Sequence, residues 1–215
     1  MLVLAAFAGS MMYATAAEDY ESAPYEVLKK DGDIEVRRYP DLMLVATGSK
    51  MDSQGGDGSF MKLFRYISGD NDADQKIAMT TPVFMQGDGS MKDVTMGFVM
   101  PGKVVQAGVP QPKGDGVKVR KRPGGTFAVI RFNGMMTGEL ARQKESELRK
   151  WIEGQNLQTA DRVDSAEGAK SVDDAKSSTA VEAASYDAPY VPPAKRRNEV
   201  LVRLNDDAAT QPEPK

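Results

Sequence analysis

The sequence predicts an α+β protein in which an antiparallel, barrel-like sheet carries two helices on its outside. Three observations favour this class: a strand-like motif occurs twice, each copy is followed by a second apolar strand and a helix, and each helix leads on to further strands. The chain has 215 residues, of which 40% are hydrophobic, so it can build one domain with a core of its own.

The repeated motif comprises residues 34–40, IEVRRYP, and residues 117–123, VKVRKRP. A Val, an Arg and the final Pro recur at equivalent positions in the two copies. Because proline cannot donate a sheet hydrogen bond, each copy is expected to lie at a sheet edge or to end at its proline. The apolar runs 42–47, LMLVAT, and 127–132, FAVIRF, are expected to form the second strands.

Each second strand is followed by a helical pattern that ends near a glycine. In residues 59–68 apolar side chains recur at intervals of three and four, which places them on one face of a helix. Gly69 is suited to the left-handed position just after that helix. Residues 138–153 also gather apolar side chains on one side, and Gly154 follows them in the same way.

More strand-like sequence follows each helix, at residues 76–85, 94–100 and 198–204. In the last two runs apolar residues alternate, as they do in strands with one buried face. Each half of the chain therefore has one apolar sheet face that it cannot cover alone. We expect the two halves to share a single core.

Three segments are predicted to be appendages of a folded domain that spans residues 18–205. Residues 1–17 contain an apolar run followed by the small-x-small pattern of a signal-peptidase site, so we expect an exported protein, either periplasmic or secreted. Residues 159–184 contain no aromatic residue, Leu or Ile and are expected to form a flexible polar insertion. Residues 206–215 are similar and are expected to be a disordered tail.

The composition excludes much familiar chemistry. The chain has no Cys and no His, which removes disulfides, thiolate nucleophiles, histidine-based triads and histidine ligation of haem iron. No nucleophile–base pair stands out, so we predict no enzymatic activity, no catalytic residue and no metal site. The net charge of −3 gives no electrostatic reason to bind nucleic acid, and no membrane span is expected in the mature chain.

Four segments carry a more specific signal: YEVLKKDGDIEVRRYPDLMLVAT (25–47), FMKLFRYISGDN (60–71), KIAMTTPV (76–83) and YDAPYVPPAKRRNEV (186–200). In this order and spacing they resemble the SOUL haem-binding protein family. The resemblance implies a distorted antiparallel barrel of two β-α-β-β halves with two flanking helices, similar to bacterial effector-binding domains. It also implies binding of haem or another tetrapyrrole without an enzymatic reaction.

The resemblance further implies how a tetrapyrrole is held. Because this chain lacks His, the mode that carries over is an apolar groove with basic residues near the porphyrin propionates. In that mode a residue matching Arg65 meets a propionate, although an ordinary solvated Arg fits the pattern equally well, and Lys195 is a candidate for the second half of the clamp. Phe64 and Tyr66 flank Arg65 on the first helix, and Met79 can line the groove or act as a weak iron ligand.

Several other motif residues are interpreted as structural. KIAMTTPV fits a buried strand whose regular pairing ends at its proline. Residues 197–199 are expected to form a network that closes the barrel, and Tyr186 and Tyr190 to form a packed aromatic corner. The basic runs at 37–38 and 120–122 are expected to face solvent.

The sequence thus predicts non-enzymatic binding of haem or a related tetrapyrrole, in a carrier, buffer or sensor. Without a strong axial ligand, affinity arises from apolar burial and propionate pairing, so we expect micromolar binding and similar binding of iron-free porphyrin. The alternative is a general effector-binding or protein-interaction module that takes another amphipathic anion or an unspecified partner protein.

Overall fold

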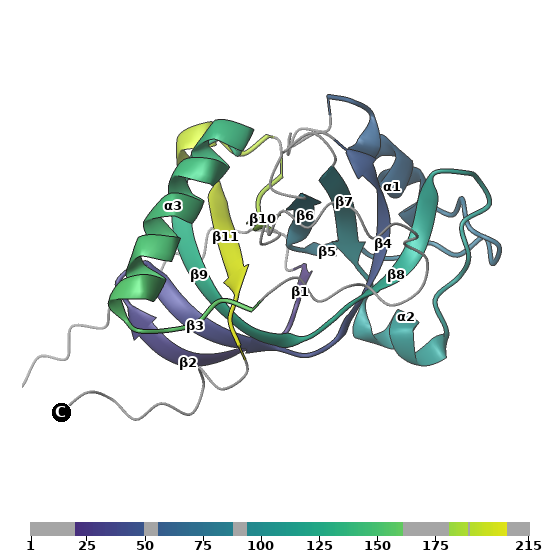
Figure 1. The fold of residues 1–215 in the computed structure, drawn as a ribbon. Coiled ribbons are helices and arrows are strands. Elements are labelled where there is room, and N and C mark those ends of the chain that lie inside the picture. The colour runs from purple at the N-terminus through teal and green to yellow at the C-terminus, as the bar shows by residue number, and fades with distance from the viewer. Residues whose placement is uncertain (1–19, 50–55, 88–93, 161–180, 189, 206–215) are drawn as a thin grey trace, which may run out of the picture.

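The computed structural model describes residues 20–49, 56–87, 94–160, 181–188 and 190–205. Within these ranges nine strands form one antiparallel sheet, with α1 and α3 packed toward its two ends (Figure 1). The predicted signal peptide, residues 161–180 of the predicted insertion, and the predicted tail lie outside the described residues.

The strands of the sheet are β2 (Glu26–Asp31), β3 (Ile34–Tyr39), β4 (Leu42–Ser49), β6 (Val83–Gly87), β7 (Val94–Val99), β8 (Val117–Arg122), β9 (Gly125–Asn133), β10 (Val181–Ser185) and β11 (Arg197–Arg203). The helices are α1 (Ser59–Ile67), α2 (Gly102–Ala107), α3 (Gly138–Gly154) and the 3-10 turn η1 (Pro193–Lys195). A separate parallel pair joins β1 (Glu21–Ser22) to β5 (Thr80–Thr81).

The two halves of the chain exchange their first strands. The sheet order is β2-β3-β9-β11-β10-β6-β7-β4-β8, so β3 of the first half pairs with β9 of the second, and β8 pairs with β4. From β3 to β8 the order places equivalent strands symmetrically about the β10–β6 pair. Neither half can complete its sheet without the other, which is the physical basis of the shared core that the repeat predicts.

The predicted α+β class is confirmed, and the barrel is corrected to an open sheet. Among the described strands, β2 and β8 each have a neighbour on one side only, so the sheet does not close. The expectation for the two prolines is confirmed, because β3 ends at Tyr39 and β8 at Arg122, each one residue before its proline.

The sheet nevertheless curls strongly around one side chain. The guanidinium carbon of Arg122, on edge strand β8, lies 4.6 Å from the ring centres of Phe84 and Phe127 and 5.1 Å from that of Tyr39. These rings belong to β6, β9 and β3, which lie three or more positions from β8 in the sheet order. Flat strands about 4.8 Å apart could not all reach one guanidinium, so the face that carries Arg122 is the inner face of a curled sheet.

The core is divided between the two faces. On the outer face, α3 buries Leu148 and Ile152 against β9 and β11, and α1 buries Leu63 and Ile67 against β4 and β7. The inner face has an apolar cluster of its own, which includes Tyr39, Leu44, Phe84, Phe127, Val129 and Leu201. No helix among the described residues is long and apolar enough to cross a membrane.

Both predicted main helices are present, but their ends differ in detail. Gly69 follows α1 with φ of 120°, as predicted, and its N–H donates to the carbonyl of Tyr66. The expectation for Gly154 is wrong, because this residue is the last of α3. Asn156, with φ of 55°, takes the left-handed position instead, which asparagine tolerates better than most non-glycine residues.

The predicted polar insertion at 159–184 is too long at both ends. Residues 181–185 form β10, in the middle of the sheet between β11 and β6, and Thr159 forms an isolated bridge with Leu204. Ala183 and Ala184 are fully buried, with the large Phe84 ring on β6 paired opposite Ala184. The sequence of this strand has no large β-branched or aromatic side chains at these positions, so it did not predict a strand. The large side chains that fill the space around the two alanines come from the neighbouring strands.

Two further differences concern the chain around β7. The predicted strand at 76–85 begins only at Thr80 and is interrupted at Pro82, which separates β5 from β6. The short helix α2 follows β7 and was not expected. Only Val104 is buried within its six residues, so it lacks the apolar stripe by which longer helices are recognised.

Candidate functional site

The outward side of α1 presents an apolar surface next to a cation. Phe64 is 43% exposed and Met61 50% exposed, while the ring of Phe60 stacks on that of Phe64 at 6.2 Å with an interplanar angle of 14°. Phe60 is anchored by an edge contact with Phe98 of β7. The exposed Arg65 follows directly, with its Nε–H donating to the Met61 carbonyl at 3.3 Å. We call Phe60, Met61, Phe64 and Arg65 the α1 surface.

Met79 belongs to the same part of the molecule. It precedes β5, is half-buried, and packs against the α1 cluster that Phe60 also joins. The structure therefore places Met79 against the same buried cluster as Phe60, and its groove-lining role stays a prediction.

Tyr66 lies in the core instead of on the α1 surface. Its side chain is 1% exposed, and its hydroxyl donates to the Pro110 carbonyl at 2.7 Å. Burial, together with the charge of Asp72, raises the pKa of Tyr66 to about 12. One residue along a helix turns the side chain by about 100°, which takes Tyr66 away from Arg65 and onto the buried stripe. The prediction of a ligand contact for Tyr66 is corrected accordingly.

Lys195 is exposed in η1, beside the end of β9, where its carbonyl accepts a hydrogen bond from Asn133 at 3.2 Å. Arg65 is on α1, which packs on β4 and β7 at the other end of the sheet (Figure 1). The structure thus separates these two cations, and the predicted clamp of Arg65 and Lys195 on one ligand is corrected to two distant positions.

The inner face holds buried ion pairs that the sequence did not reveal. Arg37 is 2% exposed and donates from Nη1 and Nη2 to the two carboxylate oxygens of Glu199, at 2.7 and 3.0 Å. Glu199 also accepts from Arg197 at 2.6 Å and from the Tyr186 hydroxyl at 2.8 Å. Burial alone would raise the pKa of Glu199, but its hydrogen bonds with Arg37 and the charges of Arg37 and Arg197 lower it.

A second buried group lies toward β8. Arg122 is 2% exposed and donates from Nε and Nη2 to the two oxygens of Glu182 on β10. The amide of Gln86 on β6 donates to Glu182 at 2.6 Å and accepts from Arg120. Four strands of the curled sheet are linked in this way, β8, β10 and β6 by hydrogen bonds and β3 by the ring of Tyr39 against Arg122.

The prediction that residues 37 and 122 face solvent is therefore wrong. Neither carboxylate is near its arginine in the sequence, since Glu199 lies 162 residues from Arg37 and Glu182 lies 60 residues from Arg122. A local pattern of charges cannot show such partners, and arginine is rarely buried without one.

The contacts around β11 confirm one further structural interpretation and limit another. The network expected of residues 197–199 is confirmed, with Asn198 donating to the Gly134 carbonyl at 2.8 Å. The aromatic corner is confirmed only for Tyr186, which packs on the inner cluster, whereas Tyr190 is 77% exposed.

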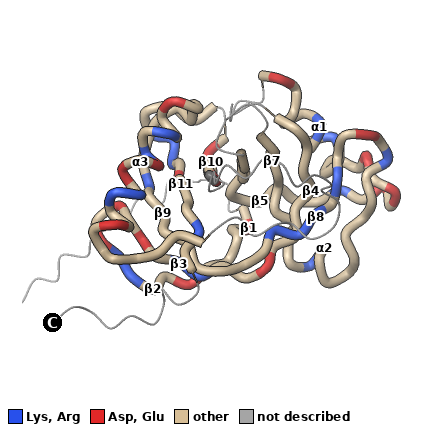
Figure 2. Tube along the Cα trace, viewed as in Figure 1, with Lys and Arg blue, Asp and Glu red and all other residues tan. Residues whose placement is uncertain are grey.

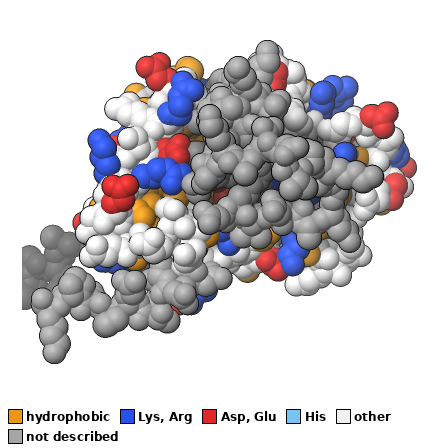
Figure 3. All heavy atoms as spheres, viewed as in Figure 1, with side chains coloured by type: hydrophobic (Ala, Val, Ile, Leu, Met, Phe, Trp, Pro, Cys, Tyr) orange, Lys and Arg blue, Asp and Glu red, His pale blue; other side chains and the backbone are white. Residues whose placement is uncertain are grey.

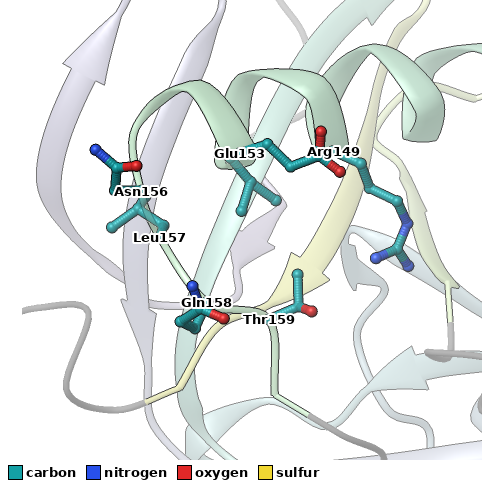
Figure 4. A pocket seen from close by; sticks show the side chains of 7 residues that line it. Arg149, Glu153, Asn156, Leu157, Gln158 and Thr159 are labelled. Carbon is teal, nitrogen blue, oxygen red and sulfur yellow. The ribbon is translucent and has the colours of Figure 1, made fainter.

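Two cavities are lined by residues that belong neither to the α1 surface nor to the buried ion pairs. One, of about 360 Å³, lies between the end of α3 and the chain that follows, and Figure 4 shows its mainly polar lining. Arg149 lines this cavity, and its guanidinium forms an ion pair with Glu145 at 2.7 Å. The other cavity, of about 270 Å³, lies between β1, the start of β4 and α2, and its two carboxylates are Glu21 and Asp41. Acidic groups at its rim do not suit the propionates of a porphyrin.

Charged residues of both signs are interspersed along α3 (Figure 2). On the face seen in Figure 3, charged side chains over the region of α3 are likewise scattered. Among the described residues, no group of three or more Asp or Glu side chains is placed to hold a metal ion.

Comparison with known families settles the resemblance. Residues 20–203 match the SOUL heme-binding protein family. The chain belongs to the SOUL family. Its match runs from the segment before β1 to the last residue of β11, so the whole curled sheet of this SOUL protein is family sequence. The comparison with curated proteins gives no match.

Solved structures support the fold of the SOUL domain. The C-terminal domain of EcmrR is similar with a TM-score of 0.53 and 11% identity, covering 85% of this chain and 98% of that one. A hydrolase from Listeria innocua has a TM-score of 0.51 and 13% identity, with coverage of 80% and 92%. EcmrR in a DNA complex has a TM-score of 0.52 and 11% identity, with coverage of 80% and 57%. At these identities the likeness concerns the effector-binding-like fold alone.

Proposed function

We propose that this SOUL protein binds haem or a related tetrapyrrole, as a carrier, buffer or sensor and without catalysing a reaction. Family membership supports the ligand class. The observation that carries the site is the α1 surface, where two near-parallel phenyl rings lie beside an exposed guanidinium. A porphyrin needs such a surface, because its plane is apolar and its propionates accept paired N–H bonds from arginine.

The side chains that could ligate iron support porphyrin binding that depends little on the metal. The chain has no His and no Cys, so histidine and thiolate axial ligands are unavailable. The thioethers of Met61 and Met79 are weak ligands, so the affinity must come from burial of the plane and from pairing with Arg65. A buried porphyrin face of a few hundred Å², at about 25 cal/mol per Å², contributes several kcal/mol before the costs of association. Pairing of a propionate with Arg65 adds to this, and we expect micromolar rather than nanomolar binding.

A haemin titration followed by the Soret band tests the proposal. We expect saturable one-to-one binding, weakened at least about tenfold in the Phe64→Ser/Arg65→Ala variant, because it loses both the ring contact and the guanidinium. Iron-free protoporphyrin should bind with a dissociation constant within about threefold of that of haemin, since no strong ligand is lost.

Two controls accompany the titration. Arg142→Ala removes an exposed cation from α3, and Lys195→Ala tests the distant position in η1. Both should bind haemin as the wild type does. Unchanged binding in the α1 variant would remove the site, and non-saturable binding in the wild type would remove haem as the ligand. Much weaker binding of protoporphyrin would instead assign a Met or Tyr ligand.

We also propose that the protein is exported and that residues 1–17 are removed. The support is the apolar run and the small-x-small pattern in that segment. Expression with the intact N-terminus in a bacterial host should yield a chain whose mass corresponds to residues 18–215. A full-length chain found only in the cytoplasm would contradict export.

A further inference from the structure

The inner side of β8 carries a line of three cations that runs from solvent into the protein. Alternate residues of a strand point to the same side, so Lys118, Arg120 and Arg122 share one face. Lys118 is exposed, Arg120 is half-buried and Arg122 is fully buried. The positive charge therefore continues from the rim of the curled sheet to its centre.

The charge of this line is not balanced by the described residues around it. Glu182 is the carboxylate that Arg122 contacts, and both of its oxygens accept from that guanidinium. Among the described residues, Arg120 donates to the neutral amide of Gln86 and to no carboxylate. Two guanidiniums thus share one carboxylate, and one positive charge remains in a largely buried position.

Two donors in this group also lack an acceptor. The Nε of Arg120 and the Nη1 of Arg122 are buried and have no hydrogen-bond partner in the part of the chain that the structure describes. Burial lowers the pKa of Arg120, and the neighbouring charge of Arg122 lowers it further while Glu182 opposes the shift. Buried donors in native proteins are nearly always paired, so this pair of N–H groups indicates a missing acceptor.

We propose that the inner face binds a small aromatic carboxylate at Arg120 and Arg122. The carboxylate would accept from the two unpaired donors and balance the excess charge. The rings of Phe84, Phe127 and Tyr39 that surround Arg122 favour an aromatic body over an aliphatic one. This site is separate from the α1 surface and does not depend on tetrapyrrole binding.

Titration calorimetry with 2-naphthoate tests the site, with 2-naphthylmethanol as the neutral analogue and inorganic phosphate as the anion without a ring. We expect one-to-one binding of naphthoate and a shift of the Arg120 Nε–H signal in ¹H–¹⁵N NMR spectra. Arg120→Gln should weaken naphthoate at least about tenfold, because it removes a charge-assisted hydrogen bond. Equal binding of the alcohol or of phosphate would overturn the proposal.

The matched control is Lys121→Gln, on the same strand but with its exposed side chain paired to Asp41. It should bind naphthoate as the wild type does. Without ligand, Arg120→Gln should be at least as stable as the wild type, because it removes an unbalanced buried charge; lost binding then cannot be assigned to unfolding. Unchanged naphthoate binding in Arg120→Gln would overturn the site, as would loss of both haemin and naphthoate, since the two sites would then be one.

Discussion

Replacing Glu182 by Ala should destabilise the protein by about 3–5 kcal/mol, because it leaves a buried guanidinium without its counter-charge. Arg122 is 2% exposed, and both of its hydrogen bonds with Glu182 would be lost. The rings around the guanidinium offer cation–π contacts, which are weaker than the lost hydrogen bonds to a carboxylate. Chemical denaturation at pH 7 measures the difference.

Two further variants make this result specific to the buried pair. Glu147→Ala removes an exposed carboxylate that pairs with Lys144 on α3, and should change stability by at most about 1 kcal/mol. Arg122→Met/Glu182→Leu removes both buried charges and should recover most of the loss, because apolar replacements of a buried ion pair are often tolerated. A loss below about 1 kcal/mol in Glu182→Ala would show that solvent reaches Arg122.

Glu199→Gln should also be strongly destabilising at pH 7, by about 3 kcal/mol or more, and the effect should disappear in acid. The contacts with Arg37 and Arg197 lower the pKa of Glu199 below its ordinary value of 4.5. Its contribution is therefore complete above pH 4.5 and is lost as the pH falls through the lower folded-state pKa. The free energies of unfolding of wild type and variant should therefore converge as the pH falls from 4.5 through the lower pKa of Glu199 in the folded protein.

Denaturation of both proteins from pH 7 to pH 2 provides the test, with Glu147→Gln as the exposed control. The control should differ from the wild type by no more than about 1 kcal/mol throughout the range. A gap between wild type and Glu199→Gln that stays constant with pH would mean that the carboxylate of Glu199 is not the group that Arg37 stabilises.

The candidate site was predictable only where its residues share one local element. Phe64 and Arg65 are neighbours on one helix, so the sequence could place them together and the structure keeps them so. Tyr66 is one position further and turns into the core, where its hydroxyl donates a hydrogen bond to the Pro110 carbonyl. Lys195 belongs to a motif far along the chain from Arg65. The order of two such segments in the sequence does not determine the distance between them in the folded protein.

The arginines of the inner face show more clearly that a sequence pattern does not predict the surroundings of a side chain. The repeat marks Arg37 and Arg120 as equivalent, but their surroundings differ, because Arg37 donates to the carboxylate of Glu199 while Arg120 donates to the amide of Gln86. Each of these contacts joins strands that are distant in the chain. Charge runs in a strand are usually solvated, so burial was the less expected outcome for Arg37.

The sequence by itself determined the α+β class, the two-half order of elements, the two main helices and family membership. These depend on residue periodicity, turn residues and motifs, which are local properties of the chain. Only the tertiary structure decided the exchange of β3 and β8 between the halves, the place of β10 at the centre, and the burial of Arg37 and Arg122. These features depend on which distant strands become neighbours, and the free energy of that choice comes from the assembled core and its ion pairs.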